Sequence, residues 1–199
     1  MEEEIILGRD ETSEVFKRFL SQFDAPAYIR RARGVQAAWE QLLDRCRQRR
    51  AEWLEIVRLR ISMLHALAGD WDNLRPLLAG EDQLDILRYH LAALATPLRA
   101  PIEPATSARA LRRALRELHE SLERFNQRWR EFLASVDLGG VNELRDGYNR
   151  YYVLEKECAV RSPRVARQGF VPLQPLTLDD LACQFPLLLV PRLLSEPEA

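Results

Sequence analysis

Residues 111–136 read LRRALRELHESLERFNQRWREFLASV, and apolar side chains recur in this stretch at alternating steps of four and three residues. An α-helix turns once every 3.6 residues, so positions with this spacing lie on one face of a helix. We therefore predict a long helix that begins at a cap on Thr106 or Ser107 and packs by this face. The face consists of Leu111, Leu115, Leu118, Leu122, Phe125, Trp129, Phe132 and Val136.

A second long helical pattern covers residues 27–68, is weakened at Gly34 and stops at Gly69. Its apolar side chains fall within an arc of about 100°, with polar side chains on the opposite side. Two shorter patterns follow at residues 71–78 and 82–94, before a proline-rich loop. We predict that the two long helices lie side by side and that the shorter helices fill the flanks.

Gly139-Gly140 ends the first pattern, and a further helix is expected from Val141 to Cys158. Because the connection is short, the two helices should form an antiparallel hairpin. Another short amphipathic helix is expected between residues 10 and 24.

Composition agrees with a helical domain. Apolar residues make up 47% and charged residues 30% of the 199 residues, and only eight are glycine. The sequence therefore predicts an all-α fold: an elongated antiparallel helical bundle with long coiled-coil-like helices and a proline-rich C-terminal tail. The bundle is expected over residues 1–161, with a loose acidic lead-in at residues 1–10, and the tail over residues 162–199.

The tail combines prolines, apolar side chains and a short helical pattern near residues 177–184. An apolar segment of this kind must cover a surface, because it is unfavourable in water. That surface is either the bundle of its own chain or a partner protein, and both alternatives stay open. The candidate docking residues are Phe170, Leu173, Leu176, Leu181, Phe185 and Leu187.

Three arginines, Arg49, Arg50 and Arg60, are expected within or beside the apolar face of the 27–68 helix. A buried guanidinium is costly unless it meets an acid or reaches the solvent. Glu155, the only acid in the apolar seam of the 141–158 helix, is an available partner. The favoured interpretation is a buried ion pair that fixes the helix register; a polar pocket inside the bundle and exposure at a helix end are the alternatives.

Motifs for catalysis, cofactors and metals are absent from the sequence. It contains no GxxxxGK[ST], GxGxxG, GxSxG or HExxH. The histidines stand on three different predicted helices, and the cysteines are far apart and lack a zinc-binding spacing. We expect no catalytic, cofactor or metal site from this set: His65, His90, His119, Cys46, Cys158 and Cys183.

The compartment is expected to be the cytoplasm. The first ten residues are acidic and lack the basic start of a secretory signal. The most apolar run, residues 185–194, is too short to cross a bilayer and contains two prolines and an arginine.

The leading hypothesis is a non-catalytic helical scaffold or accessory protein that mediates protein–protein interaction, and a homodimer is compatible with it. The alternative is a nucleic-acid-binding helical protein that uses the arginine-rich residues 30–60, which contain nine arginines and only four acidic residues. We regard nucleic acid as the weaker partner, because these arginines point in several directions. A ligand-binding or enzymatic bundle with a polar core is the third hypothesis.

Overall fold

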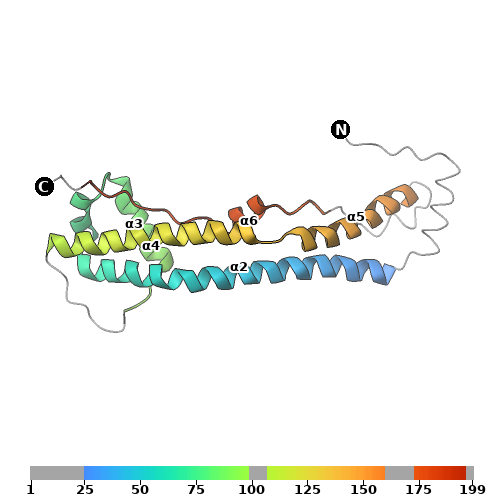
Figure 1. Cartoon of the computed structure of the whole chain (residues 1–199), viewed down its shortest axis with the longest axis horizontal. Coiled ribbons are helices and arrows are strands. Elements are labelled where there is room, and N and C mark those ends of the chain that lie inside the picture. The colour runs from blue at the N-terminus through green and yellow to red at the C-terminus, as the bar shows by residue number, and fades with distance from the viewer. Residues whose placement is uncertain (1–24, 99–106, 160–172, 196–199) are drawn as a thin grey trace. The chain divides into compact units, whose positions relative to one another are not determined.

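The computed structural model describes residues 25–98, 107–159 and 173–195, and shows an all-α helical bundle (Figure 1). The helix predicted between residues 10 and 24 lies outside these ranges. A single isolated bridge, between Leu78 and Leu193, is the only β-type pairing of the described residues. The helical elements are α2 (Ala25–Ala68), η1 (Trp71–Leu77), α3 (Asp82–Leu94), α4 (Ala108–Ser135), α5 (Gly139–Ala159) and α6 (Leu178–Gln184).

The chain divides into two compact units, which are described separately. The first unit comprises Met1–Leu43 and Asp137–Thr177, and the second comprises Asp44–Val136 and Leu178–Ala199. Each unit combines bundle and tail residues, and the division at residue 161 expected from the sequence stays a prediction. The antiparallel hairpin expected between α4 and α5 joins the two units and also stays a prediction.

Helix α4 forms one wall of the second unit. It begins where the Ser107 hydroxyl accepts a hydrogen bond from the Ala110 amide, as expected for an N-cap. The predicted face is buried from Leu111 to Trp129, but then the buried position moves to Leu133 while Phe132 is only half-buried. The shift follows because a seven-residue repeat drifts around a helix that turns every 3.6 residues.

Helix α2 ends at Ala68, as predicted, because Gly69 adopts a left-handed conformation with φ 65°. Only glycine takes this conformation readily, and its amide closes the helix by donating to the His65 carbonyl. The next element, predicted as an ordinary helix, is the 3₁₀-helix η1. Pro76 lies inside it, and proline lacks the N–H that an α-helix needs there.

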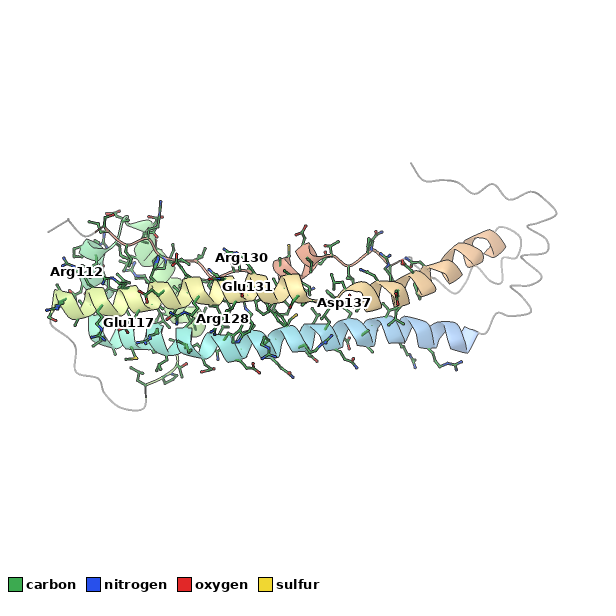
Figure 2. All side chains as sticks on the ribbon, viewed as in Figure 1. Arg112, Glu117, Arg128, Arg130, Glu131 and Asp137 are labelled. Atoms are coloured by element: carbon green, nitrogen blue, oxygen red, sulfur yellow. The ribbon has the colours of Figure 1, made fainter. Side chains whose placement is uncertain are left out.

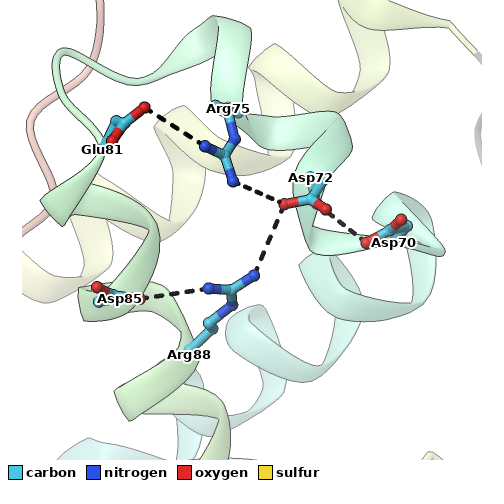
Figure 3. A network of polar contacts seen from close by, with 6 residues as sticks. All are labelled: Asp70, Asp72, Arg75, Glu81, Asp85 and Arg88. Atoms are coloured by element: carbon cyan, nitrogen blue, oxygen red, sulfur yellow. Dashed lines mark hydrogen bonds and ion pairs between the residues drawn. The ribbon is translucent and has the colours of Figure 1, made fainter.

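An exposed ion-pair network joins η1 to α3 (Figure 3). The Asp72 carboxylate meets Arg75 at 3.1 Å and Arg88 at 3.6 Å. The same two arginines also reach Glu81 and Asp85. Exposed pairs contribute only about 0–1 kcal/mol each, so this network orients the two elements more than it stabilises them.

The core of the second unit lies between the C-terminal part of α2, α3 and α4. Edge-on contacts of Trp53 with Trp129 and with Phe132 join α2 to α4. Charged α4 residues such as Arg128 and Arg130 are exposed (Figure 2). The largest side chains with less than 2% exposure are Trp129, Ile61, Leu64, Leu74, Leu87, Leu115, Leu118, Leu122, Leu181, His90 and Val57.

The first unit combines the N-terminal part of α2 with α5 and residues 173–177. Val35, Leu42 and Leu43 are buried on α2, and Val141 and Tyr148 are buried on α5. Within the described parts of the chain, no helix is both long and apolar enough to cross a membrane.

Candidate functional site

The tail residues of the second unit lie on the bundle of their own chain. Helix α6 is followed by an extended segment, residues 185–194, which we name the strap. Trp129 contacts Phe185, and His119, ten residues earlier on α4, contacts Pro191. The strap therefore runs antiparallel to α4, as Figure 1 also shows.

Only some side chains of this segment enter the bundle. Leu181 is completely buried and Phe185 is 8% exposed, with the Phe185 ring edge-on to Trp129 at 5.9 Å. Pro191 is buried as well. In contrast, Leu187 and Leu189 are 40% and 53% exposed. Burial of side chains thus accounts for only part of the contact.

Asn126 holds the main chain of Leu188 at both of its polar groups. The Asn126 Nδ2 donates to the Leu188 carbonyl at 2.8 Å, and the Leu188 amide donates to the Asn126 Oδ1 at 2.8 Å. A side-chain amide offers one donor group and one acceptor, as a residue of a neighbouring β-strand does. Asn126 is 5% exposed, so this paired contact is shielded from water.

The start of the strap is held by Trp129 and Arg50. The indole Nε1 of Trp129 donates to the Phe185 carbonyl at 2.9 Å. The Arg50 guanidinium donates to the same carbonyl and to that of Pro186, and lies over the Phe125 and Trp129 rings at 5.2 and 5.3 Å. Burial lowers the pKa of Arg50, and the nearby Tyr89 opposes this shift.

Two histidines hold carbonyls in the middle of the strap. The His90 Nε2 lies 2.6 Å from the Leu189 carbonyl, and the His119 Nδ1 lies 2.8 Å from the Pro191 carbonyl. A carbonyl only accepts, so each ring nitrogen carries the hydrogen. The other nitrogen of His90, Nδ1, is buried without a hydrogen-bond partner. Burial lowers the pKa of His90, and the bond to Leu189 opposes this.

The end of the strap is held by Gln83 and by the backbone. The Arg192 amide donates to the Gln83 Oε1 at 2.7 Å, and the Arg192 carbonyl accepts from the Ala79 amide at 3.0 Å. The Leu194 amide donates to the Leu77 carbonyl at 3.0 Å. Among the described residues, six side chains hold strap main-chain atoms: Arg50, Gln83, His90, His119, Asn126 and Trp129. We name this set the second-unit clamp.

The first unit contains a smaller clamp of the same kind. Asn142 exchanges two hydrogen bonds of 3.1 Å with the main chain of Leu176. Asn149 does the same with Leu173, at 2.9 and 3.0 Å. We name Asn142 and Asn149 the first-unit clamp. Both asparagines are half-buried, so this clamp is more open to water than Asn126.

One register relates helix and extended chain in both clamps. His119 and Asn126 are seven residues apart and hold Pro191 and Leu188, which are three apart. Seven helical residues rise about 10.5 Å and three extended residues span about 10 Å, so the two repeats match. The first-unit clamp has the same seven-to-three relation.

The arginines predicted to form a buried cluster with Glu155 have other partners. Arg60 donates to Glu117, which is labelled on α4 in Figure 2. Arg50 holds the strap, and Arg49 pairs with Glu52 at the surface. The side chain of Glu155, on α5, lies outside the described residues.

The predicted docking residues separate into several groups. Leu181 and Phe185 are buried, and Leu187 is exposed. Leu173 and Leu176 are half-buried and held by the first-unit clamp. Phe170 lies outside the described residues.

None of the clamp residues was assigned this role from the sequence, and Arg50 was singled out only as a candidate partner of Glu155. A signal exists, since His119 and Asn126, like Asn142 and Asn149, are polar residues seven positions apart beside an apolar seam. The periodicity alone does not say what such residues bind.

Three of the nine arginines in the arginine-rich region 30–60 are engaged in local pairs. Arg47, Arg49 and Arg58 each pair with an acid three residues away. These pairs compete with phosphate contacts and weaken the nucleic-acid hypothesis. Among the residues that the structure describes, no group of histidine, cysteine and acidic side chains could hold a metal ion.

Comparisons with known proteins add no relative: no family model, curated protein or solved structure matches this chain.

Proposed function

We propose that the protein is a non-catalytic helical scaffold or accessory protein that acts by binding a segment of another protein. One observation carries the proposal: six side chains from three helices of the second unit hold an extended segment by its main chain. Recognition of extended peptides commonly uses main-chain hydrogen bonds for affinity and pockets for selected side chains.

The groove beneath the strap needs an occupant. Asn126, Gln83 and His90 are 5% exposed or less, and a buried polar group that loses its partner costs about 1–3 kcal/mol. An extended segment that does not lie in a sheet needs partners for its main-chain amides and carbonyls, and this lining supplies them. The polar lining therefore supports a site built to hold extended chain.

The cytoplasm is the proposed location. Cys46 and Cys183 are free cysteines, as is usual in a reducing compartment. A second copy of this chain is one of the partners that the proposal allows.

Exchange of the tail tests this proposal. A protease site is placed within residues 160–172, and the chain is cut after folding. We expect the released segment to stay bound and then to exchange with a fluorescent synthetic peptide of residues 173–195, measured by anisotropy.

Asn126→Ala should speed the exchange about tenfold or more, because it removes both bonds to Leu188. Gln127→Ala is the matched control, since this neighbouring amide is exposed and donates to Glu131. A cut tail that never exchanges from a folded bundle would show that the strap is a core element, and would refute the proposal.

A further inference from the structure

The geometry points to the class of partner that the groove accepts: a segment with an apolar residue on a short helix, an aromatic residue four positions later, and then an extended stretch bracketed by prolines. This inference rests on the proposed function. The resident residues 181–194 are then a cover that such a segment replaces.

The polar contacts do not depend on the side chains of the occupant. Every second-unit clamp residue meets a carbonyl or an amide of residues 185–192. A foreign chain in the same extended conformation offers the same atoms at the same spacing. The clamp therefore selects conformation, and the choice of sequence depends on the buried positions.

Three buried positions define the side chains that fit. Leu181 and Phe185 are four residues apart, one helical turn, and Phe185 meets the edge of Trp129. Pro191 is buried six residues further on. The intervening Leu187 and Leu189 are exposed, so the groove does not select the side chains at those positions.

The prolines fit the pattern of donors that the groove requires. Main-chain amides of residues 188, 192 and 194 donate hydrogen bonds, whereas the prolines stand at 186 and 191. At Pro186 and Pro191 only the carbonyls are used, by Arg50 and His119. Proline thus favours the extended conformation without the loss of a donor, and a proline at 188 or 192 would be excluded.

The resident cover competes with an added peptide for the groove, and it is part of the same chain as the groove. A tethered ligand acts at an effective concentration of about millimolar, so it suppresses binding of an added peptide. Weakening the cover should therefore increase binding of the peptide, whereas weakening the groove once the cover has been weakened should decrease it. These opposite signs distinguish a replaceable cover from a structural strap.

The test uses the full chain and a fluorescein-labelled peptide of residues 178–195 as the probe. Phe185→Ala in the full chain should tighten the apparent affinity for the probe on the order of a hundredfold, because the cover loses a buried aromatic ring. Leu187→Ala, on the exposed side of the strap, is the matched control and should leave the affinity unchanged. Adding Asn126→Ala to Phe185→Ala should weaken probe binding by about tenfold.

Modified probes test the main-chain contacts directly. An N-methyl group on Leu188 of the probe removes the amide that donates to Asn126 and should abolish binding. The same modification on Leu187, whose amide has no hydrogen-bond partner within the described part of the chain, should be tolerated. Equal effects of the two modifications would overturn the register that we infer.

Other outcomes also decide the question. If Phe185→Ala stays folded by circular dichroism but binds the probe no better, the cover is not replaceable; Leu181→Ala repeats the test if Phe185→Ala unfolds. If light scattering shows a dimer of the unmodified chain that Asn126→Ala dissociates, the occupant is a second copy, and the foreign partner is wrong. If either of these two results is obtained but the cut protein still exchanges its tail, the proposed function stands and only this inference is refuted.

Discussion

The two clamps hold extended chain in the same register but in different surroundings. Each places polar side chains seven residues apart on a helix against main-chain groups three residues apart. The second-unit clamp adds the buried ring of Trp129 and the guanidinium of Arg50. The first-unit clamp consists of half-buried asparagines alone.

Both clamps orient the extended chain, but the difference in exposure means that they stabilise the fold to different extents. Hydrogen bonds that are open to water contribute little net free energy, because water replaces the lost partner. Bonds shielded by packed side chains leave unsatisfied groups when they break, and this costs more. We therefore expect changes in the second unit to have the larger effects.

The largest effect is expected for Trp129→Ala. Trp129 is fully buried, contacts the Phe125, Phe132 and Phe185 rings, and donates to the strap. Loss of a buried tryptophan typically lowers the free energy of unfolding by about 3–5 kcal/mol. Urea denaturation measures it, with the half-buried Trp39→Ala of the first unit as the comparison. Equal losses would contradict the assignment of the main anchor to the second unit.

The next largest difference between the two clamps is expected when their asparagines are replaced. Asn126→Ala is expected to lower the free energy of unfolding by about 2–3 kcal/mol, and Asn149→Ala by about 1 kcal/mol or less. The reason is exposure: Asn126 is 5% exposed, while Asn149 is half-buried. Hydrogen exchange should show faster exchange of the Leu188 amide in the first variant. A larger effect of Asn149→Ala would reverse the proposed order.

Acid should weaken the second-unit clamp through His90. Its pKa in the folded chain is lowered from the ordinary 6.5 by burial, and the ring of Tyr89 lies beside it. Above about pH 6.5 its contribution is fully present; as the pH falls toward the lowered value, the unfolded chain binds the proton first and stability is lost. The slope is at most about 1.4 kcal/mol per pH unit.

Urea denaturation at pH 7.5 and 5.5 measures this loss. His90→Gln should reduce the dependence, while exposed His65→Gln should not. His119→Gln is included because His119 also holds the strap and lies near Glu123. An unchanged pH dependence in His90→Gln would rule out His90 as its source.

The smallest effect is expected at the surface network of η1 and α3. Arg88→Gln removes the contacts to Asp72 and Asp85, both of which are exposed. The free energy of unfolding should fall by about 1 kcal/mol or less, and the difference should shrink in high salt. A loss as large as that of Asn126→Ala would show that ion pairs, and not the clamp, hold this part of the bundle.

Helices could be predicted from the sequence because their causes are local. The apolar spacing over residues 111–136, the Ser107 cap and the break at Gly69 each depend on residues within a few positions. The bounds of α3 and the end of α2 agree with the structure for this reason. The 3₁₀ form of η1 was missed, since Pro76 was not weighed as a restriction on the helix type.

Partner choice was decided by tertiary structure. The sequence predicts Arg50 within or beside the apolar face of its helix, but its partners, the carbonyls of Phe185 and Pro186, lie about 135 residues away. Asn126 meets Leu188 across 62 positions. Helical hydrogen bonds link residues four apart, so a helix can be predicted from the local spacing of apolar residues in the sequence. The partner of a buried polar group depends on which distant segment packing brings to it, and no local pattern records that.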